Sequence, residues 1–343
     1  MNTVLEMTDV SLRGKKRRTL DHVSLRVREG SLYALAGNRR SGGTELLQAA
    51  AGLLRPDSGK IRVCGLDLSV RADRRRLPRA VSYMAEVSGL DPDLTVQETL
   101  EFFAHTYGIT GLSGRERAVR LLQDTEMERL ADERIGSLPL SVRRKLDLVR
   151  TMVQRPKLLL LDRPFAGMDR RELESSHILL RQAAAEGVTV VYTADTMASC
   201  MNFCTELTVL SGGRPAGAGT APEIAKRFRE RSPIYMEVES GAEIVRRVLS
   251  EEENVHSVME DGKMFRFDFS GSPLDESELL CTLLESGAVI PSFQRRLSGA
   301  EETIWEQRDS GMIFGEDGDA ADEDGSGLNE AAGEAEQKKE DGE

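Results

Sequence analysis

A glycine-rich octapeptide near the N-terminus has residue types that could bind phosphate. Residues 37–44 read GNRRSGGT. Phosphate-binding loops of nucleotide-binding proteins have Gly, four variable residues, Gly, Lys, and then Ser or Thr. The backbone amides of such a loop surround the phosphates, and its lysine reaches the β- and γ-phosphates. Here Gly37, Gly42 and Thr44 fit the pattern, but Gly43 occupies the lysine position. We therefore expect a phosphate-binding loop that lacks its charge clamp.

The segments around this loop have the order that such a site needs. A buried strand is expected in residues 31–37, and a helix in residues 44–51. Strand, glycine loop and helix in succession support the motif, because the helix N-terminus favours anions. Apolar runs typical of buried parallel strands occupy residues 157–162 and 187–195. The first of these runs ends in Asp162, whose carboxylate should emerge at the nucleotide edge of the sheet.

Other segments of the first 230 residues show strand or helix periodicity. Residues 4–12 and 20–30 are expected to form two opening strands on either side of a basic turn. Apolar residues recur at helical spacing in residues 94–107, 114–130 and 171–186. We therefore expect mixed α/β structure in this part of the chain.

The pattern changes near residue 233. Strand, helix, strand, strand, helix and strand are indicated in turn by YMEVES, AEIVRRVLS, VHSVMED, MFRFDFS, DESELLCTLLES and AVIPSFQRR. This order is typical of a ferredoxin-like domain, which we place at residues 233–309, with Trp305 anchoring a last short helix. Residues 315–343 contain twelve acidic and two basic residues, a net charge of −10. A segment so charged and so poor in apolar residues predicts a disordered acidic tail.

The composition of the 343-residue chain excludes several classes of protein. Charged residues make up 30% and the mean hydropathy is −0.36, and no apolar run approaches the roughly 20 residues of a membrane-spanning helix. The N-terminus lacks the layout of a secretory signal. Four cysteines are too few for a disulfide scaffold and fit a reducing cytoplasm; Cys200 and Cys204 are expected in the core. No basic stripe interleaved with aromatic residues indicates nucleic-acid binding.

The chain resembles the ATP-binding subunits of ABC transporters, specifically those of ABC-2-type exporters. Residues 35–65 resemble the family's Walker A block, and residues 92–108 resemble the segment beyond its Q-loop. Residues 137–169 resemble the signature helix, the Walker B strand and the D-loop in succession. The resemblance covers residues 4–230. It implies a P-loop ABC-type nucleotide-binding domain with a helical subdomain.

The resemblance places a residual nucleotide site on the residues Gly37, Ser41, Gly42, Gly43, Thr44 and Asp162. Of these, Thr44 and Asp162 would contact Mg²⁺. Three nucleotide-contacting positions around them depart from the family pattern. The Walker A lysine is Gly43, the loop glycine three residues earlier is Arg40, and the Q-loop glutamine is Glu86. We expect Arg40 to resist the positive φ that glycine accepts freely, and so to distort the amide cradle.

The positions that serve hydrolysis in the family also differ. The catalytic glutamate after the Walker B aspartate is Arg163, and the switch histidine is Ala194. The signature LSGGQ is LPLSV at residues 138–142, where Pro139 has no amide hydrogen to donate to a γ-phosphate. No aromatic residue stands among residues 13–18, where the family usually stacks one on adenine. We expect Arg163 to pair with Asp162 or Glu86, which would neutralise the site without ATP.

These departures predict a degenerate subunit, a pseudo-ATPase that binds ATP and Mg²⁺ weakly or not at all. The resemblance implies that it is peripheral to the cytoplasmic face of the membrane. Its partners would be an integral membrane permease and a homologous ATP-binding subunit or a second copy of itself, with no nucleic acid. The permease would dock against residues 88–109, where Phe102 is expected in the core.

Two alternatives remain open from the sequence. The chain could be an active ATPase in which Arg39 or Arg40 replaces the missing lysine. It could also be a soluble ABC-fold scaffold that takes no part in transport.

Overall fold

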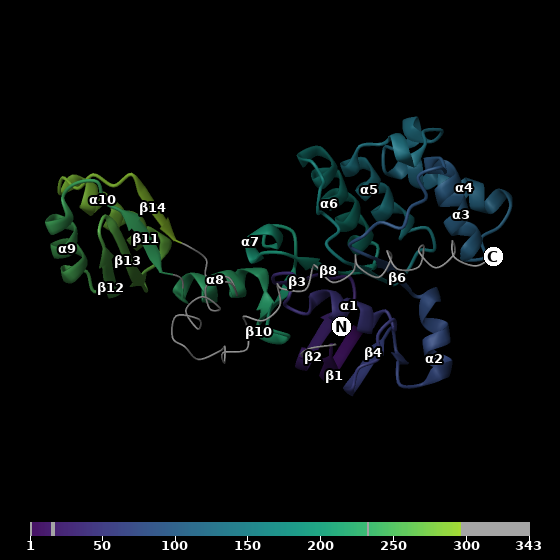
Figure 1. Ribbon diagram of the computed structural model, residues 1–343, viewed down its shortest axis with the longest axis horizontal. Coiled ribbons are helices and arrows are strands. Elements are labelled where there is room, and N and C mark those ends of the chain that lie inside the picture. Colours follow the sequence, from purple (N-terminus) through teal and green to yellow (C-terminus); the bar gives the residue numbers. More distant parts are fainter. Residues whose placement is uncertain (1, 15–17, 232, 296–343) are drawn as a thin grey trace, which may run out of the picture. The chain divides into compact units, whose positions relative to one another are not determined.

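The computed structural model describes residues 2–14, 18–231 and 233–295 (Figure 1). The expected acidic tail, the end of the expected ferredoxin-like domain and Trp305 lie outside the described residues.

The N-terminal part is built around a six-stranded sheet in the order β10-β9-β3-β8-β7-β6. Its strands are β3 (Leu32–Ala36), β6 (Val81–Met84), β7 (Leu158–Leu161), β8 (Thr189–Ala194), β9 (Glu206–Ser211) and β10 (Arg214–Thr220). All neighbours are parallel except β10, which is antiparallel to β9. Strands β3, β7 and β8 are buried along their whole length, as expected for a sheet covered on both faces. Their carboxyl ends meet at one edge, which carries the candidate site.

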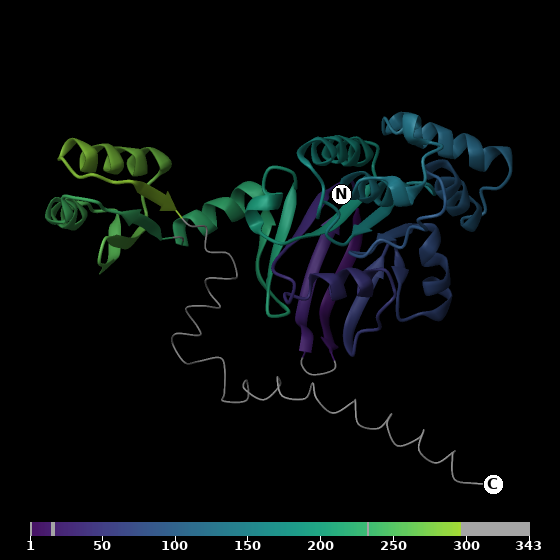
Figure 2. The same ribbon diagram turned by 45° about the horizontal axis from the view of Figure 1, so that its top comes forward.

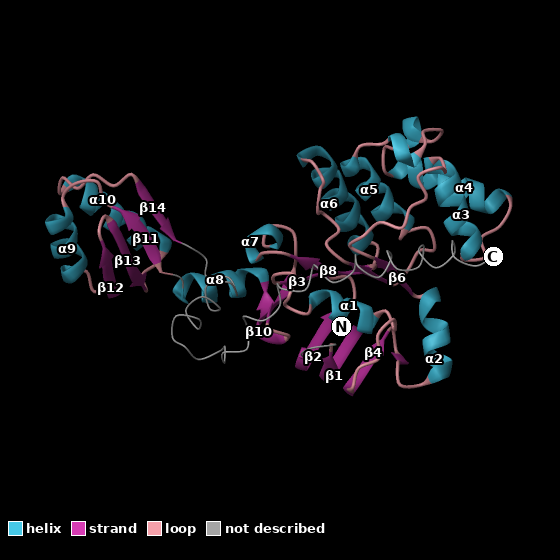
Figure 3. Cartoon of the chain, in the orientation of Figure 1, coloured by secondary structure: helices cyan, strands magenta, loops and turns pink. Residues whose placement is uncertain are grey.

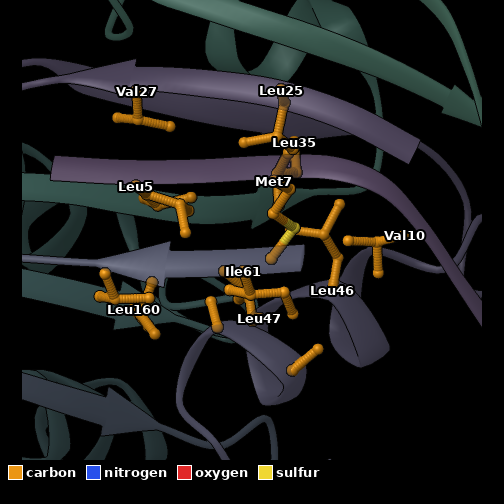
Figure 4. Close-up of a cluster of buried hydrophobic side chains, with 14 of the residues drawn as sticks. Leu5, Met7, Val10, Leu25, Val27, Leu35, Leu46, Leu47, Ile61 and Leu160 are labelled. Atoms are coloured by element: carbon orange, nitrogen blue, oxygen red, sulfur yellow. The ribbon is translucent and has the colours of Figure 1, made fainter. Parts of the chain in front are cut away.

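A second, antiparallel sheet covers one face of the first, with helix α1 (Gly43–Ala50) packed into the same core. Its order is β2-β1-β4-β5, formed by β1 (Thr3–Arg13), β2 (Arg18–Arg28), β4 (Ser58–Val63) and β5 (Leu66–Asp67). The long purple strands β1 and β2 lie side by side in Figure 2. In Figure 4, Leu5 and Met7 of β1 meet Leu46 of α1 and Leu35 of β3 in one cluster. This packing holds α1 directly after the glycine loop.

The described residues of the N-terminal part also form seven further α-helices. They are α2 (Arg71–Arg76), α3 (Val96–Thr106), α4 (Leu112–Asp124), α5 (Leu140–Arg150), α6 (Arg170–Ala185), α7 (Met197–Cys200) and α8 (Ala221–Arg231), with short 3₁₀ turns at Leu77–Arg79, Glu128–Leu130 and Ile135–Ser137. Figure 3 shows α3, α4, α5 and α6 as neighbouring cyan helices. Their apolar faces share a core that includes Leu100, Leu121, Leu146 and Leu179. This group is the helical subdomain that the resemblance implies.

The prediction that Phe102 lies in the core is wrong. Its side chain is 54% exposed, and its ring makes an edge-to-face contact with Phe103. The buried face of α3 runs through Leu100 and Ala104, and one residue corresponds to about 100° of rotation in a helix. Phe102 therefore points away from that face.

The residues after α8 form a separate four-stranded antiparallel sheet in the order β12-β13-β11-β14. Its elements are β11 (Ile234–Glu237), α9 (Ala242–Glu251), β12 (Val255–Asp261), β13 (Met264–Phe269), α10 (Pro273–Glu285) and β14 (Ser292–Arg295). Alternate residues of β13, including Phe265 and Phe267, are fully buried against Leu249 of α9 and Leu283 of α10. The βαββαβ order and the strand arrangement are those of the predicted ferredoxin-like unit.

Two further observations bear on the sequence-based expectations. Cys200 and Cys204 are both buried, as predicted for core residues. Among the described residues, every helix is too short or too polar to cross a membrane.

Candidate functional site

The loop between β3 and α1 is closed by hydrogen bonds to the protein itself. The amides of Arg40 and Ser41 both donate to Asn38, to its side-chain oxygen at 2.9 Å and to its carbonyl at 3.0 Å. The amide of Gly37 donates to the carbonyl of Ala194 at 2.9 Å. Three amides of the loop are therefore engaged without any ligand.

Backbone geometry explains which loop positions require glycine. Gly42 has φ 93°, and a Cβ there would lie 2.4 Å from the carbonyl oxygen of Thr19. Arg40 does not have a positive φ, so the strain expected at that residue is absent. At Gly43 a Cβ would lie 3.0 Å from Cγ2 of Thr193, a close contact that any side chain in the lysine position must accommodate.

Thr44 and Asp162, the predicted metal-binding pair, lie next to each other, with Asp162 directly after β7 and Thr44 in α1. Asp162 is 1% exposed, and its Oδ1 accepts hydrogen bonds from the hydroxyls of Thr44 at 3.1 Å and Thr193 at 2.8 Å. Its other oxygen, Oδ2, is buried with no hydrogen-bond partner. Oxygen ligands of this kind suit Mg²⁺. Thr44 and Asp162, the two residues that the resemblance assigns to Mg²⁺, are thus within hydrogen-bond distance of each other.

Arg163 occupies the centre of the site and is 7% exposed. Its backbone is left-handed, with φ 48°. Its amide donates to the Thr193 hydroxyl at 2.8 Å, and its side chain forms an ion pair with Asp195. Its Nε lies 4.0 Å from Oε1 of Glu86. The predicted pairing with Glu86 is therefore present at the limit of an ion pair, while Asp195 is the nearer partner.

Glu86 connects this pair to the glycine loop. Its Oε1 also lies 2.7 Å from Nη2 of Arg39, so Arg39, Glu86, Arg163 and Asp195 form a continuous chain of alternating charge. Two guanidinium groups face two carboxylates, and the charges of these four side chains cancel.

The sequence reasoning did not identify Asp195. It directly follows Ala194, the switch position, at the carboxyl end of β8. Because β7 and β8 are adjacent parallel strands with Leu161 opposite Tyr192, the residues that follow them must be neighbours. The sequence did contain a signal for this residue: the apolar run of residues 187–195 ends in Asp195, just as the run of residues 157–162 ends in Asp162.

Arg144 of α5 ties the helical subdomain to this site. Its guanidinium is buried and donates to the carbonyls of Glu86 at 2.8 Å and Arg163 at 2.7 Å. It also lies 3.6 Å from the carboxylate of Asp147, which is fully buried and contacts Arg150 at 2.6 Å. Burial lowers the pKa of Arg144 from its ordinary value. Two members of the charge chain, Glu86 and Arg163, are thus hydrogen-bonded through their backbone to the helical subdomain.

The segment that matches the family's signature begins helix α5. Pro139 is the N-cap residue of α5 and makes no side-chain capping bond. Leu140, the first residue of the helix, is 59% exposed and lies over Gly167 of the D-loop. The pKa of Asp169 is lowered by a hydrogen bond from the Glu172 amide and by one from the Ser141 hydroxyl. Pro139 has no amide hydrogen to donate to a phosphate.

The fold and the edge site define a protein with the ABC-type nucleotide-binding architecture. A structure described as the ATP binding subunit of an ABC transporter is 25% identical, with a TM-score of 0.59, covering 66% of this chain and 93% of that one. A nucleotide-free ATP-binding cassette from an ABC transporter is 19% identical with a TM-score of 0.58, covering 66% of this chain and 94% of the other; this second likeness concerns the fold alone.

Sequence comparison identifies the family. Residues 20–166 match the ABC transporter family model. The Nod factor export ATP-binding protein I of Burkholderia pseudomallei (strain K96243) is 31% identical, over 63% of this chain and 70% of that protein. The protein of the same name from Ralstonia nicotianae is 29% identical, over 64% of this chain and 68% of its own length. The chain therefore belongs to the ATP-binding subunits of ABC transporters, a family that binds ATP and Mg²⁺ and generally pairs with membrane permeases.

Proposed function

We propose that this chain is a degenerate ATP-binding subunit of an ABC-2-type membrane transporter, a pseudo-ATPase that serves as the structural or regulatory half of a nucleotide-binding dimer. The observation that carries this proposal is the charge chain Arg39–Glu86–Arg163–Asp195. In an active subunit the equivalent region holds a lysine, a glutamine and a catalytic glutamate that act on Mg²⁺ and the γ-phosphate. Here two arginines and two carboxylates satisfy one another.

The remaining residues fit Mg²⁺-ATP only in part. Thr44 and the free oxygen of Asp162 suit a magnesium ion. Gly43 supplies no cation for the β- and γ-phosphates, and Arg163 supplies no carboxylate to polarise water. Removing one preorganised transition-state donor costs on the order of 10²–10³ in rate. Losing the clamp, the general base and the switch histidine together leaves no hydrolysis mechanism that we can assign.

The proposal that the transporter is an exporter is supported by the names of similar proteins, among them the Nod factor export ATP-binding proteins described above. We place this subunit at the cytoplasmic face of a membrane, docked to a permease through residues 88–109. The exposed Phe102 and the 38% exposed Tyr107 give that segment an apolar surface for such a contact. The same proposal includes the division of the chain into an ABC-type nucleotide-binding domain at residues 4–230, a ferredoxin-like domain at residues 233–309 and an acidic tail at residues 315–343.

Dimerisation with a homologous ATP-binding subunit, or with a second copy, is also part of this proposal. A related cassette of the same fold, MJ0796, has a structure described as dimeric and bound to ADP and Pi. In a pair with an intact subunit, the partner's nucleotide would face the LPLSV segment. Pro139, which has no amide hydrogen, makes that segment a poor phosphate clamp.

The decisive test is nucleotide binding by the purified full chain. A fluorescent ATP analogue titrated with Mg²⁺ should bind much more weakly than to an intact homologue, with a Kd above the micromolar range. The matched variant Arg163→Glu with Glu86→Gln restores the family residues and removes the charge chain, so it should bind more tightly than the wild type. Micromolar affinity of the wild type, lost in Asp162→Asn, would contradict the proposal.

The two alternatives make different predictions. An active enzyme would hydrolyse ATP above background and lose that activity in Arg39→Gln. Because Arg39 is already paired with Glu86, we do not expect its side chain to take the place of the Walker A lysine at the phosphates. A soluble scaffold would fail to co-purify with a permease from detergent extracts, whereas the transporter subunit should be retained with it.

A further inference from the structure

A basic groove lies on the helical subdomain, formed by α4, the loop after α5 and the end of α6. Its larger hollow has a volume of about 950 Å³, and a second hollow of about 310 Å³ adjoins it. Both are lined by the same three arginines, Arg117, Arg120 and Arg155. The larger volume is within the range of small-molecule binding sites. The groove consists of residues other than those of the nucleotide edge.

The cations of this groove form no direct ion pair with described residues, although the nearby charges of Asp124 and Glu186 act on Arg117. In the part of the chain that the structure describes, Arg117, Arg120, Arg155 and the nearby Lys157 form no ion pair. The acidic residues that line the two hollows, Glu116, Asp124 and Glu186, all lie beyond ion-pair distance of them.

One of the arginines is held in place by hydrogen bonds to the backbone, and a second lies near it. Arg117 is half-buried and donates to the carbonyls of Val153 at 3.0 Å and Met152 at 2.8 Å, beyond the end of α5. Burial and the nearby charge of Arg155 lower the pKa of Arg117. Arg155 has a left-handed backbone with φ 52°. Like charges are thus held close together, an arrangement that a bound anion would stabilise.

The floor of the larger hollow is apolar. It is lined by Leu121, Leu159, Leu179 and Val188, all from the interior of the subdomain and the sheet. Guanidinium groups bind phosphate through paired N–H donors, which makes a cluster of arginines a typical phosphate site. An anionic group at the arginines would leave the rest of a ligand against the apolar floor.

We propose that this groove binds a small soluble molecule that carries a phosphate or diphosphate group and an apolar body. The site is independent of the nucleotide edge. It would give the subunit a ligand-sensing role that does not require ATP hydrolysis.

The test uses the full chain and inorganic pyrophosphate as the probe, measured by isothermal titration calorimetry at constant ionic strength. Pyrophosphate should bind more tightly than sulfate. Arg120→Gln and Arg155→Asn should each weaken binding at least about tenfold, the effect of losing one charged hydrogen bond. Asparagine is chosen at residue 155 because it tolerates a left-handed backbone. Arg115→Gln, an exposed change on the same helix outside both hollows, is the control and should bind like the wild type.

Unchanged affinity in Arg120→Gln and Arg155→Asn, with melting temperatures near that of the wild type, would place the anion elsewhere and overturn the proposal. So would equal binding of sulfate and pyrophosphate, which indicates only general attraction of anions. A short-chain alkyl diphosphate should bind more tightly than pyrophosphate if the apolar floor takes part. Equal affinity of these two probes would rule out the apolar body.

Discussion

Arg163, at the position where the family has its catalytic glutamate, forms its own set of contacts within the fold. Its amide, carbonyl and side chain are all hydrogen-bonded or ion-paired. The sequence showed an arginine at this position, and its positive charge predicted an ion pair with Asp162 or Glu86. The partner Asp195 became apparent only when β7 and β8 were placed side by side.

The left-handed backbone of Arg163 leads to a prediction about stability. Arg163→Gly and Arg163→Ala both remove the ion pair with Asp195. The glycine variant should be more stable than the alanine variant by about 1 kcal/mol, because a left-handed conformation costs an L-residue that amount or more. Urea denaturation of both variants measures the difference. Equal urea midpoints of the two variants would contradict this prediction, because they would mean that the backbone leaves the left-handed conformation when the arginine is removed.

Restoring the lysine alone should not restore catalysis. Gly43→Lys must accommodate the 3.0 Å approach to Thr193, and it leaves Arg163 and Ala194 in the positions of the base and the switch. We expect ATP turnover of the purified variant to equal that of Gly43→Ala in a phosphate-release assay. Turnover by Gly43→Lys that disappears in the double variant with Asp162→Asn would show that the missing lysine was the only defect.

At the scale of elements, α5 carries a buried charge cluster that joins the helical subdomain to the sheet edge. The resemblance placed a signature helix within residues 137–169, but it did not indicate the role of Arg144. A buried guanidinium on a helix face is stable only where acceptors surround it. Those acceptors are carbonyls of residues 86 and 163, which are distant in sequence.

Replacing Arg144 should destabilise the protein strongly. Arg144→Met leaves the buried carboxylate of Asp147 with one partner fewer and two carbonyls without a donor, so we expect a loss of about 3 kcal/mol in the free energy of unfolding. Arg144→Lys keeps a charge near Asp147 and should cost less. Chemical denaturation compares the two variants. A larger loss in Arg144→Lys than in Arg144→Met would contradict this account of the cluster.

Helix α6 carries a histidine that should make stability depend on pH. His177 stacks on Phe203 with ring centroids 4.1 Å apart, and its Nε2 is buried without a partner. Burial, and to a lesser degree Arg181, lowers the pKa of His177. The unfolded chain therefore binds this proton more readily, so the free energy of unfolding should fall as the pH drops below about 6.5.

The matched variant for this effect is His177→Phe, which keeps the aromatic stack without a titrating group. Unfolding free energies measured at pH 7.5 and 5.5 should differ less in the variant than in the wild type. The same pH dependence in both proteins would assign the effect to another group.

At the scale of the whole molecule, the described residues contain separate apolar cores. The core of β11 to β14 shares no residue with the cores of the ABC-type part. We expect the two parts to unfold as separate cooperative units, as the predicted boundary near residue 231 implies. Phe267 is fully buried in the C-terminal core.

Phe267→Ala should lower the stability of one unit only. Removing a buried phenylalanine costs about 3–5 kcal/mol, so differential scanning calorimetry should show one transition moved to lower temperature and the other unchanged. Leu46→Ala, in the core beneath the glycine loop, is the reciprocal variant. A single transition that moves in both variants would contradict the division into two units.

The sequence by itself indicated the family, through a resemblance, and the order of the strands and helices wherever the apolar periodicity was clear. It also showed which residues stand at the positions that the family uses for nucleotide. These features are local, since they depend on short motifs and on the period of apolar residues. Tertiary structure decided which contacts the charged residues make: the ion pair of Arg163 with Asp195, the hydrogen bonds of Arg144 to two carbonyls, and the position of three arginines around one groove. Each of these joins residues far apart in the chain. Only the packing of adjacent strands and helices brings such residues within reach of one another.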